Sequence, residues 1–149
     1  MFKENIMANY CDFEMMVRGK SESVDTFYRY LTDYENSLKN FARIFSAEID
    51  SESVNDEGIK TMKIFGDCAW SVYSCMCEGE YTYFTDNKEA DSNLTCLREA
   101  TEELSLEVEI HSKEEGMGFW EHFHYKDGEC LCDDCGDLPS SQFEMEEVA

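Results

Sequence analysis

The sequence predicts an α+β fold in which strands outnumber helices. Several segments alternate apolar and polar residues, two others repeat apolar residues at helical spacing, and Asp127-Gly128 is a strong signal for a hairpin turn. The chain of 149 residues has the length of one domain, and its 42% of hydrophobic residues can build a core. We therefore expect one domain over residues 1–135, followed by an acidic, flexible tail over residues 136–149.

The first half of the chain predicts a strand, a helix and a long hairpin. Residues 10–17 alternate between apolar and polar side chains, as a half-buried strand does. Ser21 can cap a helix, because the residues after it repeat apolar side chains at helical spacing. Alternation returns over residues 41–49, and residues 58–65 form a further strand after an acidic connector, so we expect these two strands to pair.

The middle of the chain gives a weaker signal. Residues 69–76 are apolar but too short to classify by periodicity, and residues 81–84 fit either a short edge strand or an ordered loop. A second helix is expected from residue 91 to the neighbourhood of Ser105, because leucines recur there at helical spacing.

The last part of the chain predicts a strand and a hairpin. Residues 106–111 alternate directly after the second helix, and residues 119–125 and 130–132 flank the turn at Asp127-Gly128. The order of elements is that of a ferredoxin-like β-α-β-β-α-β sandwich with an extra C-terminal β-hairpin.

The net charge of the chain is strongly negative. Asp and Glu number 34 against 12 Lys and Arg, which gives a formal charge of -22. Nucleic acids and anionic membranes would repel such a surface, whereas the cationic groove of a nucleic-acid-binding protein would attract it. The alternative is that the charge only keeps the protein soluble. The candidate partner-binding carboxylates are Glu48, Asp50, Glu52, Asp56, Glu57, Glu99, Glu102, Glu103, Glu107, Glu109, Glu114 and Glu115.

Eight cysteines raise the question of disulfides or metal binding. No apolar stretch is long enough for a membrane span or a signal peptide, so we expect a cytoplasmic protein with reduced thiols rather than a disulfide framework. Cys130, Cys132 and Cys135 form a candidate zinc site, and Cys75 and Cys77 are candidate further ligands.

A regular turn at Asp127-Gly128 would fix which residues face these cysteines. It predicts that His124 lies opposite Leu131 and that Phe123 lies opposite Cys132. The histidines of this hairpin would then face away from its cysteines, so a mixed Cys/His site is disfavoured.

The three histidines are candidate general bases or nuclease residues, because imidazole titrates near neutral pH. They are His111, His122 and His124. The sequence shows no set of partners for them and no phosphate-binding loop, zinc-protease, serine-hydrolase or deaminase motif. We therefore do not expect an enzyme, and a small hydrolase or nuclease is the weaker alternative.

Three motifs resemble one known family. They are Met7-Ala8-Asn9-Tyr10-Cys11, Gly66-Asp67-Cys68-Ala69-Trp70-Ser71, and Gly116-Met117-Gly118-Phe119 with Glu121-His122. Over residues 7–129 the chain resembles the YubB-type ferredoxin-like proteins of phages, plasmids and other mobile elements. The resemblance implies the fold and a mobile-element origin, but it supplies no catalytic residues. The residues before Met7 and the Cys-rich, acidic C-terminus depart from the family pattern.

The charge and the resemblance together predict a non-enzymatic inhibitor that imitates nucleic acid. Its carboxylates would occupy the basic groove of a host defence protein such as a CRISPR effector or another antiviral nuclease, as an anti-CRISPR or related counter-defence protein would. The alternative from a different class is a regulatory or assembly module stabilised by zinc on the C-terminal cysteines; otherwise we expect no cofactor. The candidate aromatic anchors, which core packing would explain equally, are Tyr73, Tyr81, Tyr83 and Trp120.

Overall fold

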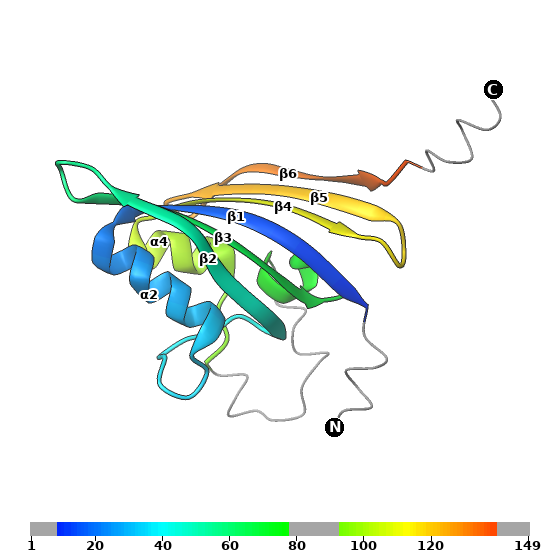
Figure 1. Ribbon diagram of the computed structural model, residues 1–149, viewed down its shortest axis with the longest axis horizontal. Coiled ribbons are helices and arrows are strands. Elements are labelled where there is room, and N and C mark those ends of the chain that lie inside the picture. Colours follow the sequence, from blue (N-terminus) through cyan, green and yellow to red (C-terminus); the bar gives the residue numbers. More distant parts are fainter. Residues whose placement is uncertain (1–8, 78–92, 140–149) are drawn as a thin grey trace.

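The computed structural model describes residues 9–77 and 93–139. These residues form an α+β structure with a single antiparallel sheet of six strands in the order β2-β3-β1-β4-β5-β6. The helices lie on one face of the sheet, and no described helix covers the other face, which we call the open face (Figure 1). The elements are β1 (Tyr10–Lys20), α2 (Ser21–Thr32), β2 (Ile44–Val54), β3 (Ile59–Ala69), the π-helix η1 (Tyr73–Cys77), α4 (Leu97–Leu104), β4 (Glu107–Glu114), β5 (Phe119–Lys126) and β6 (Glu129–Asp137).

The hydrophobic core lies between the sheet and the helices. Every second residue of β1 is buried and joins one cluster with the inner sides of α2 and α4. The inward residues of β1 are Cys11, Phe13, Met15 and Val17. The alternation predicted at residues 10–17 is confirmed, and the strand continues to Lys20 because its pairing with β3 continues that far.

Helix α2 begins at Ser21, so the prediction that Ser21 caps the helix is wrong. Lys20 holds the capping position in an extended conformation and makes no capping hydrogen bond through its side chain. Packing stabilises this helix instead: Phe27 is fully buried, and its ring lies 5.3 Å from that of Phe41. Burial of a Phe side chain contributes about 1.5–3 kcal/mol, more than a cap typically does.

The β2–β3 hairpin is displaced toward the C-terminus relative to the sequence prediction. Strand β2 runs to Val54, so residues 50–54 of the predicted acidic connector (residues 50–57) are strand. The Asn55 side chain accepts hydrogen bonds from the backbone N–H groups of Glu57 and Ile59 and closes the turn. Alternation failed as a guide because every residue from 48 to 58 is exposed, which removes the contrast between two faces.

The C-terminal hairpin forms at the predicted turn but is longer than predicted. Asp127 and Gly128 both have positive φ angles, 50° and 86°, as the tight hairpin turn requires. Strand β6 continues to Asp137, so Gly136 belongs to the sheet and not to the predicted tail. None of the described helices is long and apolar enough to cross a membrane. Residues 81–84 and 140–149 lie outside the described residues.

Candidate functional site

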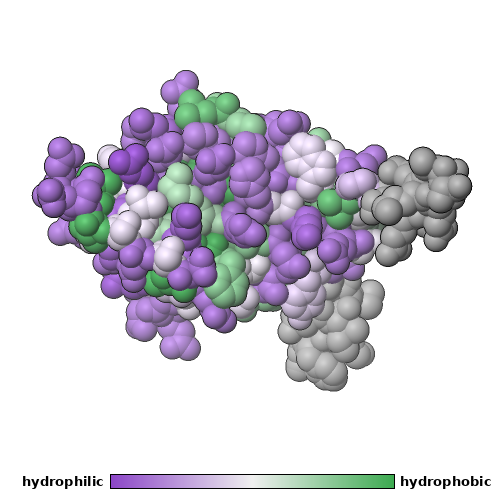
Figure 2. Space-filling view, turned by 45° about the horizontal axis from the view of Figure 1, so that its top comes forward, coloured by the Kyte–Doolittle hydropathy of each residue, from purple (hydrophilic) through white to green (hydrophobic). Residues whose placement is uncertain are grey.

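The open face of the sheet is mostly polar. The polar side chains of β1 alternate onto this face, and Asp12 lies directly between Asp67 of β3 and Lys113 of β4. Figure 2 brings the top of Figure 1 forward and shows mainly hydrophilic residues around small apolar islands. Some opposite charges face each other there: Arg18, for example, lies opposite Glu107.

All three histidines of the chain lie on this face, on β4 and β5. Ser112, Glu121 and Phe123 point inward, so the period of two turns their neighbours outward. The ladder between the two strands then places His111 directly opposite His122 and Glu109 directly opposite His124.

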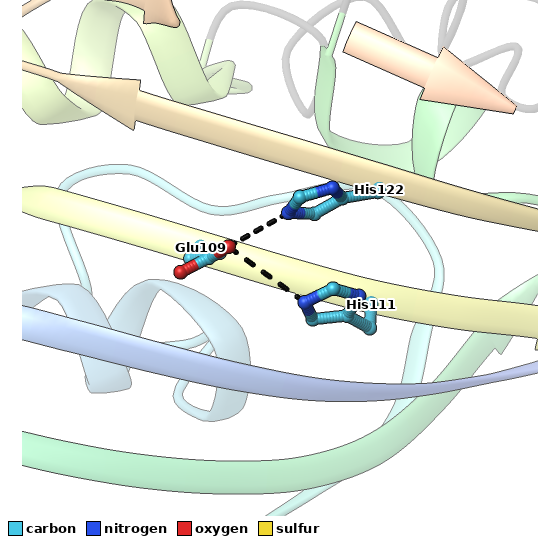
Figure 3. Close-up of side chains that lie close together, drawn as sticks. All are labelled: Glu109, His111 and His122. Atoms are coloured by element: carbon cyan, nitrogen blue, oxygen red, sulfur yellow. Dashed lines mark hydrogen bonds and ion pairs between the residues drawn. The ribbon is translucent and has the colours of Figure 1, made fainter. Parts of the chain in front are cut away.

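Glu109 joins two of these histidines (Figure 3). Its Oε2 lies 2.7 Å from Nε2 of His122 and 3.7 Å from Nε2 of His111. The two imidazole rings are stacked, with centroids 4.1 Å apart and an interplanar angle of 12°. The sequence showed no partners for these histidines, whereas the structure places Glu109 of β4 beside both of them.

The carboxylate of Glu109 is held in its charged form. Its pKa is lowered, chiefly by the hydrogen bond with His122 and further by the nearby histidines, while partial burial acts in the opposite direction. A second pair lies beside it, in which Nε2 of His124 is 2.7 Å from Oε2 of Glu107. Glu109 and Glu107 are thus two carboxylates beside the histidines that can stabilise a positive charge.

A hollow of about 390 Å³ lies next to the cluster on the open face. Glu109 and His111 form one side of it, and Glu14, Lys63 and Phe65 line the rest together with other residues. The side chain of His111 is 64% exposed, so a small ligand can reach its ring from solvent.

Strand β6 has a bulge that overturns the predicted hairpin register. Tyr125 pairs with Cys130 as predicted, but His124 pairs with Cys132 and Phe123 with Asp133, so Leu131 is the extra residue. The predicted pairing of Phe123 with Cys132 is therefore wrong.

The bulge moves Cys132 onto the open face with the histidines. Its Sγ lies 3.4 Å from Nδ1 of His122, so the prediction that the histidines face away from this cysteine is also wrong. Partial burial and the nearby Asp134 raise the pKa of the Cys132 thiol, which favours its protonated form.

The structure does not bring the predicted zinc ligands together. Cys130 shares the inner face with Tyr125, whereas Cys132 lies on the open face and Cys135 lies opposite the buried Glu121. The further candidates Cys75 and Cys77 are buried in the core on η1. Among residues 9–77 and 93–139, one group of three potential metal ligands converges, and it consists of Glu109, His111 and His122.

Cys11, Cys68 and Cys75 form a cluster of thiols inside the core. Cys11 and Cys68 face each other across the β1–β3 ladder, and all three side chains are fully buried. The pKa of Cys68 is raised by hydrogen bonds with its two thiol neighbours and by burial. These cysteines behave as small apolar core residues.

The predicted acidic surface is divided among separate parts of the molecule. Glu48, Asp50, Glu52, Asp56 and Glu57 lie on the exposed end of the β2–β3 hairpin. On α4, Glu102 is exposed, while Glu99 and Glu103 lie within 3.5 and 3.8 Å of Lys39 Nζ. Glu107 and Glu109 contact the histidines of the open face, and Glu115 is exposed at the β4–β5 turn.

Glu114 does not belong to any acidic surface, contrary to the prediction. It is only 1% exposed, because the alternation of β4 turns it inward. Its carboxylate accepts hydrogen bonds from the Asn9 side chain and from the backbone N–H of Met117, and it thereby fixes the β4–β5 turn.

The candidate aromatic anchors differ in their exposure. Tyr73 on η1 is 41% exposed, and Trp120 is half-buried on the open face, where its indole covers Gly136. Tyr81 and Tyr83 lie outside the described residues. Their role in binding stays a prediction.

Sequence reasoning missed the buried carboxylate of Glu121, which is 4% exposed. It accepts hydrogen bonds from the backbone N–H groups of Val72 and Tyr73, at 2.8 and 3.1 Å, and from the Ser112 hydroxyl at 2.7 Å. These bonds hold the start of η1 against β5. The signal was present: Glu121 occupies an inward position two residues before the buried Phe123.

Comparison with known proteins does not assign the chain to a group. No family model, no curated protein and no solved structure gives a significant match. The resemblance to the YubB-type proteins therefore stays a prediction.

Proposed function

We propose that this protein is a non-enzymatic inhibitor that inserts an acidic hairpin into the cationic nucleic-acid groove of a host defence protein. A CRISPR effector or another antiviral nuclease is the expected class of partner, which places the action of the protein in the host cytosol. The observation that carries the proposal is the end of the β2–β3 hairpin, where residues 48–58 are all exposed and include five carboxylates and no basic residue.

The shape of this hairpin suits insertion. Its end extends beyond α2 at one side of the molecule (Figure 1). Lys60 pairs with Val54 beside the turn, and its Nζ lies 3.0 Å from Glu52 and 2.8 Å from Asp25, which offsets part of the charge. Asp56 and Glu57 lie in the turn itself, so the end of the hairpin remains negative.

The spacing of the charges limits what the hairpin can imitate. Alternate residues of a strand are roughly 6.8 Å apart, which is about twice the rise per nucleotide along one strand of a duplex. The bulge between Ile49 and Ser51 interrupts that spacing, because Glu48 pairs with the exposed Phe65 whereas Glu52 pairs with the buried Met62. Glu48 and Glu52 therefore lie on opposite faces of the hairpin, and the carboxylates of β2 are sparser and less regular than the phosphates of a double helix.

Apolar side chains on the same hairpin offer contacts that charge cannot provide. Ile49 is 38% exposed and Val54 is 54% exposed, and both lie among the carboxylates. Charge steers and orients a partner, whereas a few desolvated apolar anchors commonly supply much of the binding energy.

We further infer that β1 to β4 with α2 and α4 form a ferredoxin-like unit to which β5 and β6 add a hairpin. The antiparallel order β2-β3-β1-β4 supports this, because β1 and β3 are the two central strands of that arrangement. The inference agrees with the mobile-element family that the motifs resemble.

The proposal is tested by capture from a host lysate at low and high salt, using the full chain and two variants of equal net charge. One variant, D50N/D56N/E57Q, neutralises three of the five hairpin carboxylates. Its control, E35Q/E115Q/E129Q, neutralises three exposed carboxylates elsewhere. We expect the hairpin variant alone to lose a captured nucleic-acid-binding protein, and we expect DNA or guide RNA to compete for that protein. A partner that binds its nucleic acid and this chain together, with no mutual effect, would contradict the proposal.

A further inference from the structure

The Nε2 atoms of two histidines and a carboxylate oxygen converge on one point of the open face. The donor atoms of Glu109, His111 and His122 all lie within 4.8 Å of one another. A tetrahedral ion with bonds of about 2.0–2.1 Å holds its ligand atoms roughly 3.4 Å apart. The observed separations from Glu109 Oε2, 2.7 and 3.7 Å, lie on either side of that value. Small changes in these two separations would therefore match the ligand spacing of an ion.

The sheet places all three donors on the open face. Glu109 and His111 are two residues apart on β4 and share one face, and His122 lies directly across the ladder from His111. The stacked rings point their nitrogens in nearly the same direction, so one ring must tilt for both lone pairs to meet an ion. His111 is the one that can tilt, since its side chain is 64% exposed against 28% for His122.

Cys132 can form a hydrogen bond with Nδ1 of His122 both when no metal ion is bound and when an ion is bound to Nε2. Without an ion, Nε2–H of His122 can donate to Glu109 while Nδ1 accepts from the Cys132 thiol at 3.4 Å. With an ion on Nε2, the ring proton moves to Nδ1 and donates to the sulfur instead. A group that holds the distal nitrogen of a ligating histidine is typical of metal sites.

From this geometry we propose that Glu109, His111 and His122 bind a divalent first-row transition metal, with Zn²⁺ as the reference ion. Two imidazoles and one carboxylate are donors that such ions accept, whereas Ca²⁺ and Mg²⁺ require more oxygen ligands. Three protein ligands leave a position for water or an exchangeable ligand, which the exposed side of the cluster can admit. This site is distinct from the acidic hairpin, and neither proposal depends on the other.

The alternative is that the cluster only fastens β4 to β5 through hydrogen bonds. His124 provides a matched control, because it makes an equivalent contact of 2.7 Å to Glu107 on the same face but does not belong to the converging group. A purely structural role predicts similar behaviour for both histidines.

The test is titration of the reduced full chain with Co²⁺, followed by displacement with Zn²⁺, in the wild type and in H111Q, H122Q, H124Q and C132S. We expect one Co²⁺ per chain, with ligand-field absorption and without the intense charge-transfer absorption that thiolate ligands give. H111Q and H122Q should each lower the affinity on the order of 100-fold, and C132S roughly tenfold, as loss of an outer contact typically does. H124Q should leave the affinity unchanged.

Several results would overturn the proposal. These are no binding at millimolar Co²⁺, an equal loss in H124Q, or a thiolate charge-transfer band that marks a cysteine site. Circular dichroism of each variant without metal separates a lost ligand from a lost fold. If H111Q unfolds, E109Q gives the same test through the third ligand and retains the shape of the side chain.

Discussion

Replacement of Glu121 by Gln tests whether a buried carboxylate holds the π-helix against the sheet. In the wild type, Oε1 accepts from Val72 N and from the Ser112 hydroxyl, and Oε2 accepts from Tyr73 N. In E121Q an NH₂ group replaces one oxygen and faces a donor, which costs about 1.5–3 kcal/mol for the lost bond to a charged acceptor. The two remaining bonds become neutral and lose roughly half their strength, or about 0.5 kcal/mol each.

The expected loss of unfolding free energy is therefore about 3 kcal/mol, which corresponds to a decrease in Tm of roughly 9 °C for a chain of this size. Urea unfolding followed by far-UV circular dichroism measures it, and the midpoint should fall while the slope stays the same. The control is E115Q, at a carboxylate whose side chain is 73% exposed. Because the chain carries a net charge of -22, neutralising Glu115 should be neutral or slightly stabilising. An E121Q protein as stable as E115Q would refute the anchoring role.

Two further predictions concern β4 and the C-terminal hairpin. Because the folded pKa of Glu109 is lowered, its contribution to stability is present above the ordinary carboxyl range, near pH 4.3, and is lost as the pH falls through the folded pKa. The stability difference between wild type and E109Q should thus shrink below about pH 4.3 in acid unfolding curves, and a difference that grows there would contradict the assigned shift. Gly128→Ala should lower the free energy of unfolding by about 1–2 kcal/mol, because residue 128 has a φ of 86°. The added methyl group would also lie 2.9 Å from Cβ of Glu102, which increases the loss. Gly58→Ala is the control, since its φ is 82° and nothing lies within 4 Å, and an equal loss in the two variants would show that the Glu102 contact is harmless.

The sequence predicted the elements best where one face of a strand is buried and the other is not. β1 satisfies this condition, and its alternation was correct; β2 beyond Ala47 is exposed on both faces, and its boundaries were wrong. The prediction of Glu114 on the surface failed for the opposite reason. Glu114 is the last residue of β4, where the alternation turns it inward, and the turn at Met117 supplies hydrogen bonds to its carboxylate.

The candidate site could be predicted only in part. Alternation alone places Glu107, Glu109 and His111 on one face of β4. Their convergence with His122 depends on the register between β4 and β5, and the contact with Cys132 depends on a bulge at Leu131. A bulge is one unpaired residue, and nothing in the local sequence distinguishes it from a regular turn that continues the ladder.

The most direct test of the proposed function is the rate at which the purified chain associates with its captured partner as ionic strength is varied. If the hairpin carboxylates steer the encounter, D50N/D56N/E57Q should associate roughly tenfold more slowly than wild type at low salt, and the two rates should converge at high salt. The control E35Q/E115Q/E129Q should follow the wild type closely. Association rates that decrease equally in both triple variants would mean that only net charge matters, and that the hairpin is not the contact surface.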